Sequence, residues 1–193
     1  KDFTGRSINE INLYSTEMSS ALCSIDRVSA SANMNNRLSE AIVEAYKSTN
    51  GAPISFELML KCYQSRMKDA NNDDSISSVL KQLVNAHIFE SEDKVSLIDD
   101  SYIIKMDGYP KDGPIAKAIV YFLMSKLNNI YELLDKQAVN DEVVQIRHFS
   151  IIDEAHYMLD FDNRPLRNLI AVGRNKGLSI ILATQNMSSF KSK

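Results

Sequence analysis

The stretch HFSIIDEAH, residues 148–156, decides which fold we expect. Its apolar run ends abruptly in two adjacent acids, Asp153 and Glu154. Such a run predicts a buried strand, and ligands of open α/β sheets bind at the carboxyl ends of the strands. We therefore expect an α/β fold in which this strand delivers two carboxylates to a ligand site.

The two acids suit the hydrolysis of a nucleotide, in which each has a separate role. Mg²⁺ keeps much of its hydration and accepts only one or two carboxylates, so Asp153 is our candidate metal ligand. Glu154 is our candidate catalytic base, because an acid on a rigid support polarises the attacking water. In this interpretation the stretch is a Walker B motif. The simpler alternative is that both acids begin a loop or cap the next helix.

A second stretch, GRNKGLSIILATQ at residues 173–185, predicts another buried strand over residues 178–183. This strand ends in the polar pair Thr184 and Gln185. A glutamine in this position could orient a water or sense a γ-phosphate, and Thr184 is our candidate for contact with the nucleotide. Two buried strands thus finish at the same sheet edge, a combination that is more specific than either stretch alone.

Taken together, IIDEAH, the helix predicted after it and GRNKGLSIILATQ resemble the second half of the motor domain in the HerA/FtsK superfamily of hexameric DNA-translocating ATPases, which includes the VirB4-like conjugation ATPases. The resemblance is sharp over residues 102–185. A helical insertion and the wording DEAHYML are most similar to the ATPase subunit of bacterial DNA phosphorothioation-dependent restriction systems. The resemblance implies a P-loop ATPase whose incomplete RecA-like parallel sheet is flanked by helices.

The same resemblance implies cofactors, partners and a location. The cofactors are ATP and Mg²⁺. The partners are double-stranded DNA, bound by the assembled parent protein, further copies of the chain in a hexameric ring, and other subunits of the restriction system. The implied location is the cytoplasm, without a membrane partner.

Arg174 and Lys176 lie at the end of the helix predicted before the second strand, and they have two interpretations. Cations at a helix C-terminus are favourable because of the helix dipole, so both side chains could simply cap the helix. The resemblance implies instead that Arg174 reaches the nucleotide of a neighbouring subunit, as an arginine finger that stabilises the transferring phosphoryl group. Arg164 and Arg167 are weaker candidates for that role.

The phosphate-cradling motif GxxxxGK[ST] does not occur in the sequence. We therefore interpret the chain as a fragment of a larger motor, its Walker B and sensor half, which does not hydrolyse ATP alone. The alternative, from a different class of protein, is a non-catalytic interaction or assembly module with a degenerate ATPase-like fold. A Walker A loop elsewhere in the parent protein would favour the motor. A two-domain DEAH-box helicase fits poorly, because that group does not follow its DEAH with a strand ending in ATQ.

The composition bounds these interpretations. Of 193 residues, 44% are hydrophobic and 24% charged, as in ordinary globular proteins. The net charge of -3 gives no overall basic footprint, so contact with DNA would need a local patch or an assembled pore. The sequence has no signal peptide and no apolar run long enough for a membrane span. Cys23 and Cys62 have no CxxC spacing, and the three histidines form no zinc motif.

The sequence divides into three expected parts. Residues 1–14 would hold the end of an upstream core strand and a connection. Residues 15–93 show helical periodicity and would form a small inserted helical subdomain, with helix N-caps at Ser55 and at Asp74 or the residue after it. Residues 94–193 would form the C-terminal half of the RecA-like core.

Within the third part the pattern predicts a strand, a long helix and then the acidic strand. The first strand covers residues 102–106, the helix runs from Pro114 to about residue 136, and the acidic strand covers residues 144–152. This is a βαβ unit, so the two strands should be parallel. Pro165 opens a further short helix.

Overall fold

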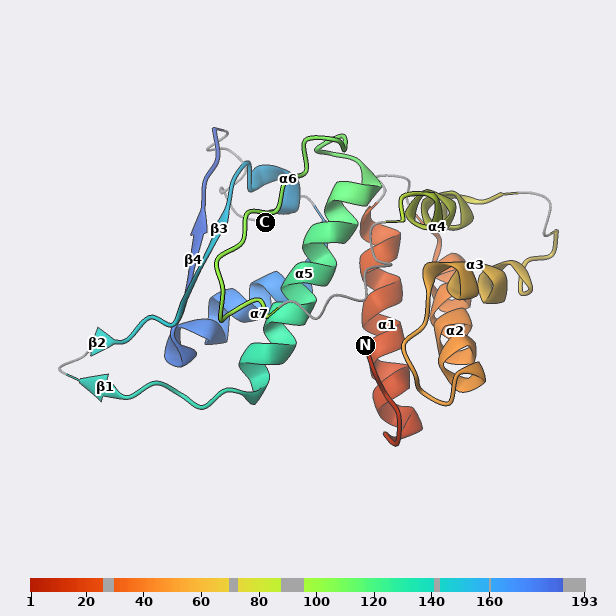
Figure 1. The fold of residues 1–193 in the computed structure, drawn as a ribbon. Helices are drawn as coiled ribbons and strands as arrows, with labels where there is room; N and C mark the ends of the chain where they lie inside the picture. The colour runs from red at the N-terminus through yellow and green to blue at the C-terminus, as the bar shows by residue number, and fades with distance from the viewer. Residues whose placement is uncertain (26–29, 70–72, 88–95, 141–142, 160, 186–193) are drawn as a thin grey trace. The chain divides into compact units, whose positions relative to one another are not determined.

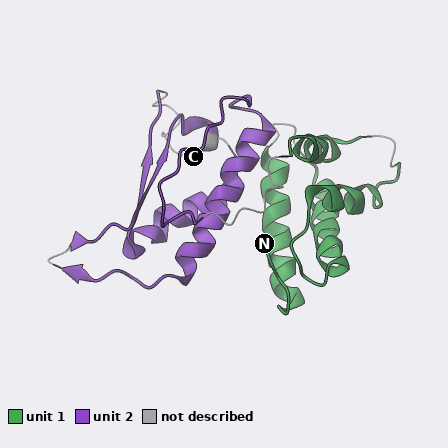
Figure 2. Ribbon diagram, viewed as in Figure 1, with its two compact units in different colours: residues 1–91 green, residues 92–193 purple. Residues whose placement is uncertain are grey.

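The computed structural model describes residues 1–25, 30–69, 73–87, 96–140, 143–159 and 161–185. The chain forms two compact units, Lys1–Ser91 (unit 1) and Glu92–Lys193 (unit 2) (Figure 2). The described part of unit 1 is helical without strands, whereas unit 2 combines helices with strands. The α/β class expected from the sequence is therefore confirmed.

Unit 1 is a small bundle in which each helix packs against its neighbour in sequence (Figure 1). In addition, the first helix packs against the fourth. The large side chains at its centre include Tyr46 and Tyr63, both almost fully buried. The helices are α1 (Ile8–Ile25), α2 (Ala32–Ser48), α3 (Phe56–Gln64) and α4 (Ser75–Asn85).

The first residues of the chain belong to this bundle. We expected residues 1–14 to hold the end of a strand, but the structure has a turn followed by α1 there. The backbone amide of Phe3 donates to the carbonyl of Gly51 at 2.7 Å. The Phe3 ring is only 3% exposed, and its centroid lies 5.0 Å from that of Tyr46. Burial of this aromatic ring among helices fixes the segment without a sheet.

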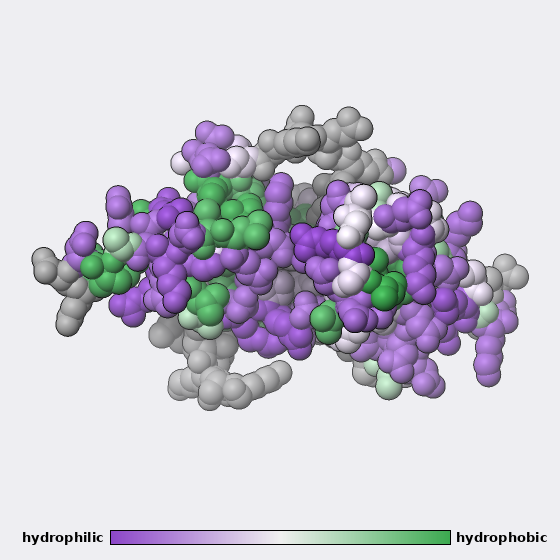
Figure 3. Space-filling model, turned by 90° about the horizontal axis from the view of Figure 1, so that it is seen from below, coloured by the Kyte–Doolittle hydropathy of each residue, from purple (hydrophilic) through white to green (hydrophobic). Residues whose placement is uncertain are grey.

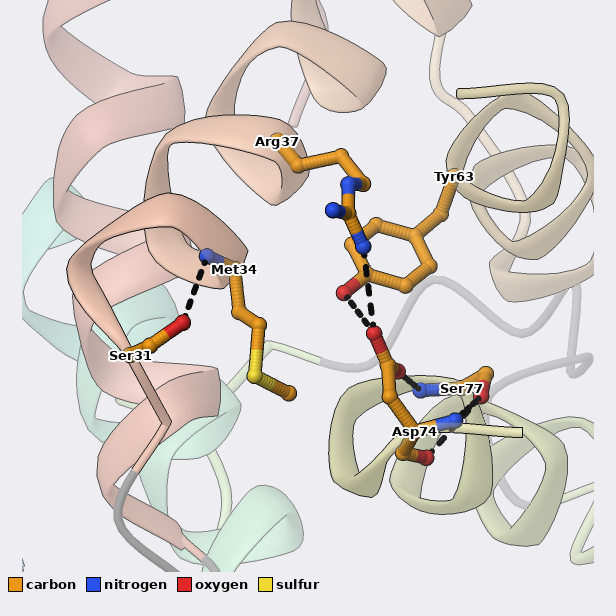
Figure 4. Close-up of polar contacts among 6 residues, drawn as sticks. All are labelled: Ser31, Met34, Arg37, Tyr63, Asp74 and Ser77. Carbon is orange, nitrogen blue, oxygen red and sulfur yellow. Dashed lines mark hydrogen bonds and ion pairs between the residues drawn. The ribbon is translucent and has the colours of Figure 1, made fainter. Parts of the chain in front are cut away.

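Asp74 joins three helices of unit 1 (Figure 4). As predicted, it caps α4: its side chain accepts from the Ser77 amide at 2.9 Å, and the Ser77 hydroxyl accepts from the Asp74 amide at 2.9 Å. The other carboxylate oxygen accepts from the Tyr63 hydroxyl of α3 at 2.7 Å and from Arg37 of α2 at 3.3 Å. Burial and this bond to Asp74 raise the pKa of Tyr63, which keeps the phenol protonated as a donor. The predicted cap at Ser55 is also present.

Unit 2 is built around one long helix and a short parallel sheet (Figure 1). Helix α5 begins at Pro114, as the sequence predicts, and ends at Leu133. The elements of unit 2 are α5 (Pro114–Leu133), β1 (Val139–Asn140), β2 (Val143–Val144), β3 (His148–Ile152), α6 (His156–Leu159), α7 (Arg164–Val172), the 3₁₀ helix η1 (Gly173–Lys176) and β4 (Leu178–Leu182).

Strands β3 and β4 pair in parallel, with His148 opposite Leu178 and Ile152 opposite Leu182. One face of this pair meets the helices, because Leu178 packs in a buried cluster with Leu127 of α5 and Leu169 of α7. The chain crosses from β3 to β4 through α6, α7 and η1. The two strands therefore run in the same direction with their carboxyl ends adjacent.

The other face of the pair is exposed. Because side chains alternate along a strand, Phe149 and Ile151 of β3 share a face with Ile181 of β4, opposite Ile151. Their exposed fractions are 56%, 68% and 44%. In the space-filling view of Figure 3, hydrophobic residues lie at the surface of unit 2. Parallel sheets are usually covered on both faces, whereas the described residues of unit 2 leave this apolar face uncovered.

Two strand predictions were wrong in detail. Residues 102–106 form no strand, and Ile103 is 89% exposed, so the expected βαβ unit with this segment is absent from the described residues. The acidic strand begins at His148, because Val144 pairs with Val139 in a separate antiparallel hairpin. Strand formation depends on an available partner, which the local sequence does not specify. The described sheets have two strands each, β1 with β2 and β3 with β4.

The length and hydropathy of each helix indicate whether it could span a membrane. Among the described residues, none of the helices combines the length and the apolar character needed to span a bilayer.

We predict that Asp74→Ala lowers the free energy of unfolding of unit 1 by about 2 kcal/mol, because it removes the cap of α4 and leaves Tyr63 and Arg37 without their shared acceptor. The matched control is Asp73→Ala, which removes an exposed ion pair with Lys81 and should change stability by less than about 0.5 kcal/mol. Urea unfolding followed by circular dichroism measures both. Equal effects of the two substitutions would contradict the joining role of Asp74.

We predict that Gly177→Ala destabilises unit 2 by about 2 kcal/mol or more. Gly177 has φ of +83°, and an added Cβ would lie 2.7 Å from the carbonyl oxygen of Gln145. Its own carbonyl accepts from the amides of Arg147 and His148, which starts the β3 and β4 ladder. Gly108→Ala is the control, since nothing lies within 4 Å of its added Cβ. Thermal unfolding should separate the two variants clearly; the same melting temperature for both would refute the conformational requirement.

Candidate functional site

The carboxyl ends of β3 and β4 bring four of the predicted site residues together. Asp153 and Glu154 follow β3, and Thr184 and Gln185 follow β4. The parallel ladder continues past the strand ends, because the Ala183 amide donates to the Ile152 carbonyl at 2.9 Å. The Gln185 side-chain amide donates to Glu154 Oε1 at 3.4 Å. The Glu154 carboxylate and the Gln185 amide thus lie side by side at the sheet edge where the sequence predicts both strands to end.

Glu154 has a strained backbone. Its φ is +51°, in the left-handed region that costs a non-glycine residue about 1–2 kcal/mol. Its amide donates to Asp153 Oδ1 at 2.8 Å, and the next residue, Ala155, donates to the Ala183 carbonyl at 2.8 Å. These bonds hold the turn on both sides of Glu154. The turn keeps the Glu154 side chain at the strand ends, with only 22% of it exposed.

The two carboxylate oxygens of Glu154 have different surroundings. Oε1 faces the Gln185 amide and the ammonium of Lys111, whose Nζ lies 3.9 Å away. Oε2 is buried and accepts no hydrogen bond from the described residues, although His156 Nδ1 lies 3.4 Å from it. The two side chains form an ion pair when the imidazole is protonated. Oε2 is therefore closed off from solvent, beside His156.

His156 connects the two strand ends. Its Nδ1 lies 2.9 Å from Thr184 Oγ1, a hydrogen bond whose direction depends on the tautomer of the ring. The ring also packs on Tyr157, with centroids 4.1 Å apart. Its contacts in the structure are with residues of the candidate site itself.

Asp153 and Thr184 are the residues that suit a hydrated magnesium ion. The Asp153 side chain is exposed, and one of its oxygens is occupied by the Glu154 amide. Its other oxygen and the Thr184 hydroxyl are oxygen donors of the kind that Mg²⁺ prefers, and this ion needs only one or two carboxylates when water and phosphate complete its shell. The described residues hold no group of three or more His, Cys, Asp or Glu side chains around one point, so a caged metal has no ligand set there.

Arg174 lies at the other end of the sheet. It belongs to η1, which precedes β4, whereas Glu154 follows β3. Five strand residues at about 3.3 Å each separate the two ends by roughly 16 Å. The structure therefore does not bring Arg174 to Glu154 within this chain, and its role toward a neighbouring subunit stays a prediction.

Lys176, in contrast, caps a helix, as one of the two sequence interpretations predicted, but the helix is a different one. Its Nζ donates to the carbonyls of Tyr131 at 2.6 Å and Glu132 at 3.0 Å. These carbonyls lie in the last turn of α5, where no amide follows within the helix, and the Tyr131 carbonyl also accepts from the Leu134 amide at 3.3 Å. Lys176 is thus a helix cap, but of α5 rather than of the helix that precedes it in sequence.

Lys111 is the site residue that sequence reasoning missed. Its local sequence indicates only turns, because of Gly108 and Gly113. No local pattern indicates that this lysine would lie beside an acid 43 residues further along the chain.

The two cysteines lie outside this site. Both are free thiols of unit 1, and burial raises the pKa of Cys23 to about 11. Burial is also the main cause that raises the pKa of Cys62. Neither environment favours the reactive thiolate.

Neither a scan of protein-family models nor a search of curated proteins finds a match for this chain.

We predict that Lys176→Met destabilises unit 2 by about 1 kcal/mol, because two carbonyls at the end of α5 lose a charged donor. Arg174→Met is the matched control, since its side chain is exposed, and it should leave the stability within about 0.5 kcal/mol of the original. Urea unfolding of the two variants, side by side, makes the comparison. If Arg174→Met were the more damaging substitution, the assignment of the cap to Lys176 would be wrong.

Proposed function

We propose that this chain carries the base and sensor half of an ATP-hydrolysing site in a DNA-translocating motor with a RecA-like core. The observation that carries the proposal is the meeting of Glu154 and Gln185 at the adjacent ends of two parallel strands, with 3.4 Å between the amide nitrogen and Oε1. Motors that hydrolyse nucleotides need an acid and a water-orienting amide at such an edge.

In this proposal the residues divide the work of activating one water molecule. Glu154 accepts a proton from the water at Oε1, the oxygen that faces Gln185 and Lys111. Gln185 holds the same carboxylate and orients the water. Thr184 contacts the nucleotide and is held in place by His156. When Mg²⁺ is bound, Asp153 and Thr184 would hold it, and the ion would neutralise charge that develops on the phosphates.

The phosphates of ATP need a further binding element, because these 193 residues contain no GxxxxGK[ST] loop. We propose that a loop outside this sequence supplies it, so that residues 1–193 alone do not hydrolyse ATP. The remaining parts of the proposal follow the resemblance to the HerA/FtsK superfamily: double-stranded DNA as the track, a hexameric ring of identical subunits, Arg174 acting on the neighbouring nucleotide, and a role beside other subunits of a phosphorothioation-dependent restriction system in the bacterial cytoplasm.

A second candidate is an interaction module with a degenerate ATPase-like fold. The observation in its favour is the uncovered apolar face of β3 and β4, formed by Phe149, Ile151 and Ile181. A partner that covered this face would gain stability from burying it, whether or not the acids have a catalytic role. The two candidates differ in whether Glu154 is needed for hydrolysis.

We predict that Glu154→Gln in the full-length protein lowers the rate of DNA-stimulated ATP hydrolysis by about 10²- to 10⁴-fold, because the amide cannot take the proton of the attacking water. ATP binding should persist. The measurement is phosphate release with and without duplex DNA, beside equilibrium binding of ATP.

Glu132→Gln is the control for this substitution, since Glu132 is exposed on α5 and lies outside the site. It should hydrolyse ATP at the original rate. If the original protein hydrolyses no ATP with any DNA, and Glu154→Gln changes nothing, the interaction module becomes the better description.

A further inference from the structure

Lys111 lies beside the candidate base, on its solvent side. Its Nζ is 3.9 Å from Glu154 Oε1, the same oxygen that faces the Gln185 amide. The Lys111 side chain is 63% exposed, whereas that of Glu154 is 22% exposed. The ammonium group therefore occupies the open side of a partly enclosed carboxylate, where a ligand would approach.

The position of Lys111 is set by the turns that lead into α5. The Tyr109 amide donates to the Met106 carbonyl at 3.1 Å, and the Gly113 amide donates to the Pro110 carbonyl at 2.9 Å. These bonds close one turn before Lys111 and another around it. Pro114 then opens α5 directly. The lysine is thus presented from a structured connection at the start of a 20-residue helix.

The negative charge at this edge of the sheet would repel an anionic ligand unless a cation lay nearby. Asp153 and Glu154 place two carboxylates where an anionic ligand would bind, and like charges at close range repel. Arg174 and Lys176, the two basic side chains of η1, lie at the opposite end of β4. Lys111, in contrast, lies at the site, because it forms an ion pair with Glu154.

The contact between Lys111 and Glu154 is easily exchanged. An exposed ion pair contributes only about 0–1 kcal/mol, and the lysine stem is flexible. A phosphate group that enters the site offers more negative charge and more acceptor oxygens than one carboxylate. The ammonium group would then exchange the carboxylate for the phosphate with a movement of its side chain alone.

We propose that Lys111 is a further ligand-binding residue of this site, which pairs with Glu154 before the nucleotide binds and contacts the terminal phosphate of the bound nucleoside triphosphate. The inference rests on the function proposed above and adds a residue that distinguishes a triphosphate from a diphosphate. A contact to the terminal phosphate is available with ATP and absent with ADP.

The test is equilibrium binding of ATP and of ADP to the full-length protein and to Lys111→Ala. We expect the Kd for ATP to rise about tenfold, the size expected for loss of one charge-assisted hydrogen bond, and the Kd for ADP to change by less than about twofold. Lys111→Arg should restore most of the affinity for ATP, because it keeps the charge. Lys136→Ala, an exposed lysine beyond the far end of α5, is the matched control and should change neither constant.

An unchanged Kd for ATP in Lys111→Ala would overturn the inference, as would an equal loss of ATP and ADP, which indicates a general effect on the structure. The proposed function is judged separately, by the hydrolysis rate of Glu154→Gln. If that variant is inactive while Lys111→Ala binds ATP normally, the motor interpretation stands and the role of Lys111 is refuted. If the original protein binds neither nucleotide, both proposals fail.

Discussion

The candidate site depends on the parallel ladder between β3 and β4 and on its continuation past the strand ends. The amide of Ala183 donates to the Ile152 carbonyl, and the amide of Ala155 donates to the Ala183 carbonyl. These two bonds anchor the chain before and after Glu154, so the turn between them has little freedom. The backbone that carries the carboxylate is thus held by hydrogen bonds on both sides, which is the kind of rigid support that precise chemistry needs.

Features that are determined within a few residues could be predicted from the sequence. Ser55 and Asp74 cap helices because a short polar side chain reaches amides two or three residues ahead, and Pro114 starts a helix because its φ is already suitable. The strand expected at residues 102–106 failed for the opposite reason. Its apolar residues fit a strand, but a ladder needs a second strand at the right place, and Val144 likewise pairs with Val139 instead of extending β3.

The same distinction applies to the site. That Glu154 and Gln185 meet follows from the rule that parallel strands share an edge, so two sequence patterns were sufficient. The contacts of Lys111 and Lys176 were not predictable in this way. Each lysine reaches over 40 residues along the chain to its partner, and nothing in its local sequence distinguishes it from an ordinary surface lysine. Such contacts follow from the packing of α5 beside the sheet and appear only with the fold.

The conformation of Glu154 helps to decide between a site and a plain turn. Glycine, asparagine or aspartate would adopt the φ of +51° of Glu154 at lower cost, but a positive φ does not by itself mark a site, since His87 after α4 has φ of +49°. One oxygen of the Glu154 carboxylate is also buried without a hydrogen bond from the described residues, with His156 Nδ1 3.4 Å away. Both costs fall on one residue, at the end of a strand, beside an amide and two ionisable side chains. A strained backbone and a buried carboxylate oxygen without a hydrogen bond, both at Glu154, fit the proposal that this residue acts on a ligand.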